Sequence, residues 1–316
     1  MDVIIQALIP LFSIILLGYL VGRFKILGMN SAKVLNTFVM KISLPILVFS
    51  AVATEPLHRV LNGPFVLAFL LALFIPYIIS FIIGRFHGAE SISKSALRAL
   101  AYSLPNTGYM GIPLMHALFG SEGVLIASIA TFLTVSIILL TIILCELDRQ
   151  ESCEFKVLVK KTALICIKNP LLIATALGIL YSSLQLPMPT PFHTFIELIG
   201  NVAGPCALFA LGELIVGQSL AKEPIEVSLI SIVKLIVQPA IALFFLWNFN
   251  VDQTWAIGGF LLSALPTAVI LAVLIDYYQT YLQKGLSSIL ITTISSVGTL
   301  LIVIGVASKV WGSIHP

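Results

Sequence analysis

The sequence consists mainly of apolar runs of about 20 residues, separated by short polar stretches. Folded as a helix, a run of about 20 residues crosses the ~30 Å hydrocarbon core of a lipid bilayer. Of the 316 residues, 59% are hydrophobic and 10% are charged, whereas roughly 25% of the residues in a soluble domain are charged. These features exclude an ordinary soluble enzyme. A net charge of +3 gives no reason to expect nucleic acid as a partner.

The apolar runs predict an all-α integral membrane fold of about ten transmembrane helices. The first run is expected to be a retained span rather than a signal peptide, because Asp2 stands where a signal peptide has basic residues and because Arg23 and Lys25 follow the run. The predicted spans are residues 3–22, 33–53, 64–84, 92–119 (broken), 122–145, 164–184, 192–217, 226–248, 255–276 (broken) and 285–308.

Lys and Arg residues indicate the orientation, because they gather in the cytosolic loops of membrane proteins. The loops after odd-numbered spans hold twelve of them, whereas the loops on the other side hold only Arg59 and Lys309. We therefore expect a multi-pass protein of the plasma (inner) membrane with both termini outside the cytosol. The twelve are Arg23, Lys25, Lys33, Arg85, Lys94, Arg98, Arg149, Lys156, Lys160, Lys161, Lys222 and Lys284.

An internal repeat divides the chain into two halves. Six residues, each a proline, a glycine or a phenylalanine, recur in the same order 160 to 163 positions later. Examples are Pro10 with Pro170 and Pro105 with Pro266. The predicted divisions are a first five-helix repeat at 1–145, a cytosolic linker at 146–163 and a second five-helix repeat at 164–316. Because five is an odd number, the second repeat would enter the membrane inverted, as in secondary transporters.

Two of the predicted spans cannot form continuous helices. Residues 101–113 contain Pro105, Gly108, Gly111 and Pro113, and Pro266 occupies the matching position in the second half. Unwound backbone is tolerated in a membrane only where it faces protein or water, because unsatisfied N–H and C=O groups cost several kcal/mol each in lipid. We predict that the two breaks face each other at mid-membrane and act as hinges around a polar site. The alternative is that the prolines merely kink two packing helices.

The predicted site favours a small organic anion. Half-helices that start at a break carry free N–H groups and about half a positive charge at their N-termini, which suits a carboxylate. Lys41 and Lys234 lie within spans and could draw anions inward, or their side chains could snorkel to the cytosol. Asn201 could contact the substrate or bond a neighbouring helix. The residues expected to bind substrate are Asn106, Thr107, Tyr109, Thr267, Asn201 and Lys41.

Signatures of enzymes and metal sites are missing from the sequence. It has no HExxH, GxSxG or Walker A motif, so we expect no catalysis, no cofactor and no ATP-driven pumping. Transport would be passive or driven by a gradient, with H⁺ or Na⁺ coupling left open. The four cysteines lack the spacing of a zinc site and are expected to be free thiols; they are Cys145, Cys153, Cys166 and Cys206.

Several motifs resemble one known family. Residues 104–114, which read Leu-Pro-Asn-Thr-Gly-Tyr-Met-Gly-Ile-Pro-Leu, resemble the fourth-helix crossover of the auxin efflux carrier family, which includes the plant PIN proteins and microbial malonate and malate carriers. Residues 169–172, 201–212 and 265–268 support the resemblance, which covers essentially the whole chain.

The resemblance implies a fold like that of bile acid sodium symporters, with a scaffold of spans 1, 2, 6 and 7 and a transport domain of spans 3–5 and 8–10. The crossed helices would hold the substrate while the transport domain moves as an elevator, and Pro105, Asn106 and Pro266 would take the crossover roles. A homodimer through the scaffold is left open. The short linker and Thr267, where plant members often have Gln, favour a small microbial carrier over a plant-type role.

The sequence therefore predicts a secondary active or facilitative transporter of small organic anions, meaning mono- or dicarboxylates or auxin-like weak acids. Two alternatives stay open. One is a sodium-coupled symporter of the bile-acid type on the same fold, and the other is a membrane receptor that binds the anion without moving it.

Overall fold

The computed structural model describes residues 2–28, 30–54, 62–86, 90–149, 170–185, 188–216 and 224–311. Within these ranges every regular element is a helix. Six of the helical stretches are long and apolar enough to cross a membrane, and shorter apolar helices lie at 13–23 and 173–184. The all-α membrane prediction is confirmed at this level. The described helices overlap all ten predicted spans, and the inverted arrangement of the spans stays a prediction.

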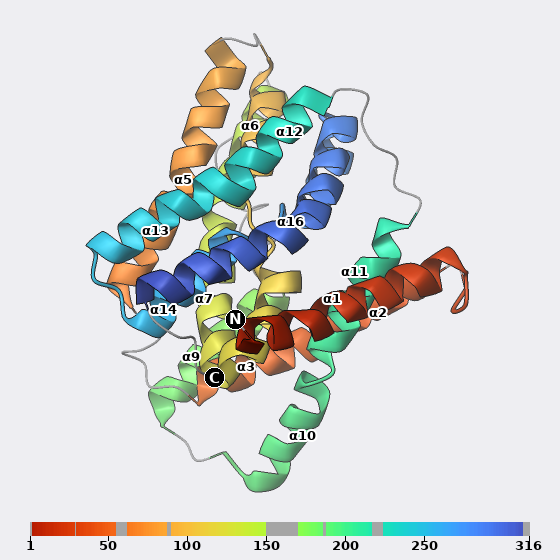
Figure 1. The fold of residues 1–316 in the computed structure, drawn as a ribbon, viewed down its shortest axis with the longest axis vertical. Coiled ribbons are helices and arrows are strands. Elements are labelled where there is room, and N and C mark those ends of the chain that lie inside the picture. Colours follow the sequence, from red (N-terminus) through yellow and green to blue (C-terminus); the bar gives the residue numbers. More distant parts are fainter. Residues whose placement is uncertain are drawn as a thin grey trace.

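The helices pack as two groups (Figure 1). In the first group, α1 packs against α11 and α3 packs against α9, with α2 and α10 alongside. Its members are α1 (Asp2–Arg23), α2 (Ser31–Phe38), the π-helical turn η1 (Val39–Ser43), α3 (Leu44–Ala53), α9 (Pro170–Leu184), α10 (Thr190–Gly200) and α11 (Ala203–Ile215).

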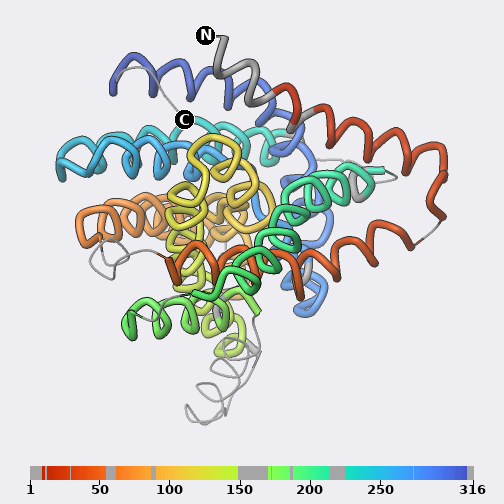
Figure 2. Tube along the Cα trace, turned by 90° about the horizontal axis from the view of Figure 1, so that it is seen from below, coloured from red at the N-terminus to blue at the C-terminus, as the bar shows by residue number. Residues whose placement is uncertain are grey.

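In the second group, α5 packs against α6 and α13, and α12 packs against α16. Its members are α5 (Gly63–Phe86), α6 (Ile92–Ser103), the π-helical turn η2 (Thr107–Gly111), α7 (Ile112–Arg149), α12 (Pro224–Ile232), the π-helical turn η3 (Val233–Val237), α13 (Gln238–Asn248), α14 (Gln253–Ser263), α15 (Ile270–Tyr278) and α16 (Leu282–Trp311). Figure 2 shows α7, in yellow, near the centre between α5 and α11, so α7 links the two groups.

All three π-helical turns end two residues before a proline. They precede Pro45, Pro113 and Pro239. A proline inside a helix donates no hydrogen bond, and its ring clashes with the carbonyl four residues earlier. One wider turn gives that carbonyl more room while the helix continues. The prolines thus account for the positions of the wide turns.

The seam between α1 and α11 depends on glycine. A Cβ atom added at Gly18 would overlap the carbonyl oxygen of Phe209, and one added at Gly212 would overlap the carbonyl oxygen of Ile15. Small residues let membrane helices approach at backbone distance. Because each of the two helices supplies one of these glycines, the approach is close on both sides of the seam.

The predicted boundary between the fourth and fifth spans is a sharp turn within the segment labelled α7. Gly120 lies within α7 and has φ 57° and ψ −137°. Glycine adopts such a backbone without the steric cost that a side chain brings. The chain therefore turns back at Gly120. A Cβ atom added at Gly123 would overlap the carbonyl oxygen of Met115, so the parts of α7 before and after Gly120 are two helical segments that pack closely.

Candidate functional site

Two interrupted helices meet backbone to backbone in the second group. Helix α6 ends at Ser103 and α14 ends at Ser263, and the following segments pair through an antiparallel bridge between Pro105 and Thr267. The amide of Asn106 donates to the Pro266 carbonyl at 2.9 Å, and the amide of Ala268 donates to the Leu104 carbonyl at 3.1 Å. We call residues 104–106 and 264–268 the paired breaks.

Proline sets the position of each break. Pro105 and Pro266 lack the N–H group that a continuing helix needs, and the residue before a proline is pushed toward an extended conformation. Leu104 accordingly has φ −84° and ψ 104°. Carbonyls at the ends of α6 and α14 therefore need donors from elsewhere.

Side chains from the paired breaks themselves, from α13 and from η3 supply those donors. Thr267 Oγ1 donates to the Ala101 carbonyl at 2.9 Å, Gln238 Nε2 donates to the Ser103 carbonyl at 2.7 Å, and Lys234 Nζ donates to the Ser263 carbonyl at 2.9 Å. A fourth bond satisfies an amide, because Thr292 Oγ1 on α16 accepts from the Thr267 amide at 3.1 Å. The paired breaks are thus held by α16, η3 and α13.

Asn106 carries an unused donor at the paired breaks. Its side chain is 2% exposed, and its Oδ1 atom accepts from the Tyr109 amide at 3.3 Å, where Asn106 is the N-cap of η2. Its Nδ2 atom is buried and has no hydrogen-bond partner among the described residues. A buried donor without a partner is costly, so a ligand or water is expected to complete it.

Thr107 and Thr267 lie with Asn106 and are buried, but their hydroxyls have partners. Thr131 Oγ1 on α7 donates to Thr107 Oγ1 at 3.0 Å, and Thr267 donates to Ala101 as described. Tyr109 is half-buried, and its hydroxyl faces Asn36 on α2. Tyr109 therefore reaches from the second helix group to the first.

The other two predicted contact residues lie elsewhere. Lys41 is exposed in η1 and lines an apolar groove of about 390 Å³ between α3, α9 and α10. Asn201 is exposed and lines a pocket of about 270 Å³ with His116 and His193. The pocket lies between the two groups, because His116 belongs to α7 and His193 to α10. The structure thus brings Asn106, Thr107 and Thr267 together, and it places Lys41 and Asn201 in separate pockets.

Lys234 and Gln238 are the residues whose role at the breaks was not predicted. Both are fully buried, so Lys234 does not snorkel. Their signal in the sequence is two polar residues, four positions apart, within an apolar run. Their partners Ser263 and Ser103 lie 29 and 135 positions away along the chain, so the pairing depends on the folded structure.

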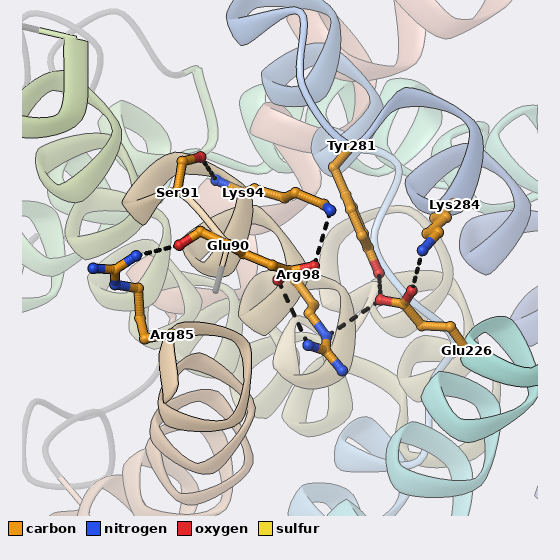
Figure 3. Close-up of polar contacts among 8 residues, drawn as sticks. All are labelled: Arg85, Glu90, Ser91, Lys94, Arg98, Glu226, Tyr281 and Lys284. Atoms are coloured by element: carbon orange, nitrogen blue, oxygen red, sulfur yellow. Dashed lines mark hydrogen bonds and ion pairs between the residues drawn. The ribbon is translucent and has the colours of Figure 1, made fainter. Parts of the chain in front are cut away.

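A network of charged and polar side chains ties the far end of α6 to other helices of the second group (Figure 3). Arg98 on α6 contacts Glu90 at 3.5 Å and Glu226 on α12 at 3.2 Å. Glu226 also pairs with Lys284 on α16 at 2.6 Å and accepts from the Tyr281 hydroxyl at 2.6 Å. Arg98 therefore bridges Glu90 and Glu226.

Glu90 extends the same network toward α5. Lys94 pairs with its carboxylate at 3.0 Å, and the Arg85 guanidinium donates to its backbone carbonyl. The network thus joins α5 and α6, from one predicted repeat, to α12 and α16 from the other.

No metal site is found in the part of the chain that the structure describes, where no three His, Cys, Asp or Glu side chains gather as ligands. Cys206 in α11 is a free thiol, and the Cys145 thiol is buried and lies 3.8 Å from the Ser93 carbonyl. Cys153 and Cys166 lie outside the described residues.

In the described residues, six long apolar helical stretches surround a buried polar break, as in a multi-pass membrane protein. The family described as "Membrane transport protein" matches residues 3–304. The chain belongs to this family, the PIN-like auxin efflux carrier family that the motif at 104–114 resembles.

Several relatives with similar sequences are described as transporters. The chain is 27% identical over 293 residues to a Rhizobium meliloti protein described as "Putative malonate transporter", with 92% of each chain covered. It is 23% identical over 305 residues to an uncharacterized transporter of Methanothermobacter thermautotrophicus, with 93% of this chain and 95% of that protein covered. The mouse lysosomal cholesterol signaling protein is 26% identical over 226 residues, which cover 67% of this chain and 26% of the mouse protein.

Proposed function

We propose that this membrane transport protein is a secondary carrier of small organic anions, with mono- and dicarboxylates as substrates, and that the paired breaks form its substrate site. The unpaired Nδ2 atom of Asn106 carries the proposal, because it is a buried donor that lacks an acceptor. A carboxylate oxygen is an acceptor that forms strong, charge-assisted hydrogen bonds.

The helix ends beside Asn106 favour the same class of ligand. The chain re-enters a helix at Thr107 after one break and at Ile270 after the other. Each restart turns the positive end of a helix dipole toward the breaks, and the amides of Thr107, Tyr109, Leu271 and Ala272 there already have acceptors. Carriers built on interrupted helices use such ends to bind the charged groups of their substrates. The description of the Rhizobium relative names a dicarboxylate, malonate.

The two helix groups suggest how the anion would move. We propose that the first group is a fixed scaffold and that the second group carries the site across the membrane as an elevator. The groups meet at the site through side chains and through backbone approach, as in the contact of Tyr109 with Asn36 and the approach of Gly204 to Pro113. The inverted repeats at 1–145 and 164–316, the plasma-membrane location and a dimer through the scaffold belong to the same proposal.

Uptake into proteoliposomes tests this function. The purified carrier is offered labelled malonate, succinate, acetate and a neutral sugar, with Na⁺ and H⁺ gradients imposed separately. We expect saturable uptake of at least one carboxylate, no uptake of the sugar, and no uptake in liposomes without protein. Saturable binding without uptake would instead identify a receptor, and no binding of any carboxylate would reject the anion site. The two imposed gradients also show whether either cation is coupled to transport.

A further inference from the structure

Lys234 places its amine at the negative end of an interrupted helix. Its side chain is 0% exposed, and its ammonium donates to the carbonyl of Ser263, the last residue of α14, at 2.9 Å. No carboxylate of the described residues lies within ion-pair distance of it. A buried cation without an anionic partner is costly and is retained in membrane proteins mainly for function.

Gln238 makes the equivalent contact at the other interrupted helix. Its Nε2 atom donates to the carbonyl of Ser103, the last residue of α6, at 2.7 Å. Lys234 and Gln238 belong to neighbouring elements, η3 and α13. A single helical segment therefore binds the C-terminal ends of both α6 and α14, one with a charge and the other with a neutral amide.

The difference between the two contacts has an electrostatic consequence. The C-terminal end of a helix carries about half a negative charge, which would repel an anion bound at the paired breaks. A neutral amide satisfies the hydrogen bond at α6 without removing that charge, whereas an ammonium more than cancels it at α14. A protonated Lys234 would therefore place a positive charge behind the breaks, in a region of low dielectric constant where charges act strongly.

We propose that Lys234 is the charge-selecting residue of the carrier: its ammonium positions the end of α14 and makes the site prefer a dianion to a monoanion, and a monoanion to a neutral solute. The proposal rests on the proposed function, since it assumes that the paired breaks bind the substrate. It assigns the preference to a residue that need not touch the substrate, and Gln238 provides a neutral comparison within the same structure.

Malonate, malonamate and malonamide test this role, because they have similar size and carry two, one and no negative charges at pH 7.5. The measurement is the binding affinity of each compound for the purified full-length carrier, and the readout is the affinity ratio of malonate to malonamate. The variants are Lys234→Met, which keeps the length and removes the charge, and Lys234→Arg, which keeps the charge. Gln238→Leu removes the neutral contact, and Lys309→Met is the same change as Lys234→Met at an exposed lysine.

We expect wild type, Lys234→Arg, Gln238→Leu and Lys309→Met to prefer malonate to malonamate by about tenfold or more, and Lys234→Met to lose most of this preference. A purely structural role would weaken all three ligands equally and leave the ratio unchanged, which would overturn the proposal. Thermal unfolding shows whether Lys234→Met folds. If it does not fold, the affinities of the wild-type carrier test the proposal, and tighter binding of malonamide than of malonate would overturn it. Failure of wild type to bind any carboxylate would instead reject the proposed function.

Discussion

Asn106 combines an observed structural role and the proposed binding role in a single amide. Its oxygen caps η2 by accepting from the Tyr109 amide, and its nitrogen is left without a partner. The motif at 104–114 was enough to select this residue, because an amide beside a proline break is a costly feature in an apolar span. The division of labour between the two atoms of the amide became visible only in the structure.

Asn106→Asp and Asn106→Ala should separate those two roles. The aspartate keeps an oxygen for the cap but loses the donor and adds a negative charge, so folding should be retained while carboxylate binding falls. The alanine loses both atoms, and its affinity should fall about 10–100-fold, since a hydrogen bond to a charged group contributes about 1.5–3 kcal/mol. Isothermal titration with the transported carboxylate measures both variants.

Ser128→Ala is the control for Asn106, because the Ser128 hydroxyl is buried and bonds only the Val124 carbonyl of its own helix. It should bind substrate like wild type. Wild-type affinity in Asn106→Asp would remove the amide nitrogen from the site and would contradict the proposed function at its central residue.

At the scale of helices, the prolines in the sequence allowed the breaks to be predicted but not the wide turns. Pro105 and Pro266 indicated both breaks, and the structure pairs them through a bridge and two backbone hydrogen bonds. The three wide turns could not be foreseen, because a proline in a membrane helix is compatible with a kink, a break or a wide turn. Which of these forms is decided by the neighbouring helices that accept the displaced groups.

Replacing the break prolines should impair transport more than stability. In Pro105→Ala or Pro266→Ala a new N–H group lets α6 or α14 extend across the break, which would compete with the bridge and move the N–H groups of the following helix. We expect uptake to fall at least severalfold while the protein still inserts and purifies. Pro10→Ala, at an exposed proline inside α1, is the matched control. Normal uptake in both break variants would mean that the prolines only shape packing.

The ion-pair network makes a separate prediction about α6, α12 and α16. Glu226 contacts Arg98, Tyr281 and Lys284, so Glu226→Gln removes the charge that links three helices. We expect the free energy of unfolding to fall by about 1–3 kcal/mol, less than for a fully buried pair because the network is partly exposed. Thermal unfolding in detergent measures it, with Asp252→Asn, an exposed carboxylate without a capping bond, as the control. Equal losses in the two variants would show that the network contributes nothing specific.

For the whole molecule, composition and periodicity were sufficient to predict that the chain lies in a lipid bilayer, that its fold is helical, and where most of its helices are. The assignment of spans to a scaffold and a transport domain, which the family resemblance implied, stays a prediction. The sequence did not reveal how the two helix groups pack against each other. That packing depends on the side chains on the facing helix surfaces, not on the apolar runs along the chain. The pocket shared by His116, His193 and Asn201 is such a feature, since its residues come from α7, α10 and the turn after α10.

Orientation in the membrane is a prediction for the whole molecule, and accessible cysteines test it. In a cysteine-free background, single cysteines at positions 153 and 222 should react with an impermeant maleimide only from the cytosolic side, and those at 58 and 252 only from outside. Positions 58, 153 and 222 lie outside the described residues, and 252 precedes α14. Reaction of position 153 or 222 from outside would reverse the topology and remove the basis for inverted repeats.

The wide turn η3 also limits where the sequence can accept an inserted or deleted residue. A π-helical turn contains one more residue than an α-helical turn, so the five residues Val233–Val237 behave as a single-residue insertion in an otherwise regular helix. Deleting one of them would restore the α-helical register and rotate everything before it by about 100° relative to α13. Lys234 and Gln238 could then no longer reach the carbonyls of Ser263 and Ser103 at once. Insertions and deletions should therefore be far less acceptable here than substitutions, even though the segment reads as ordinary apolar helix.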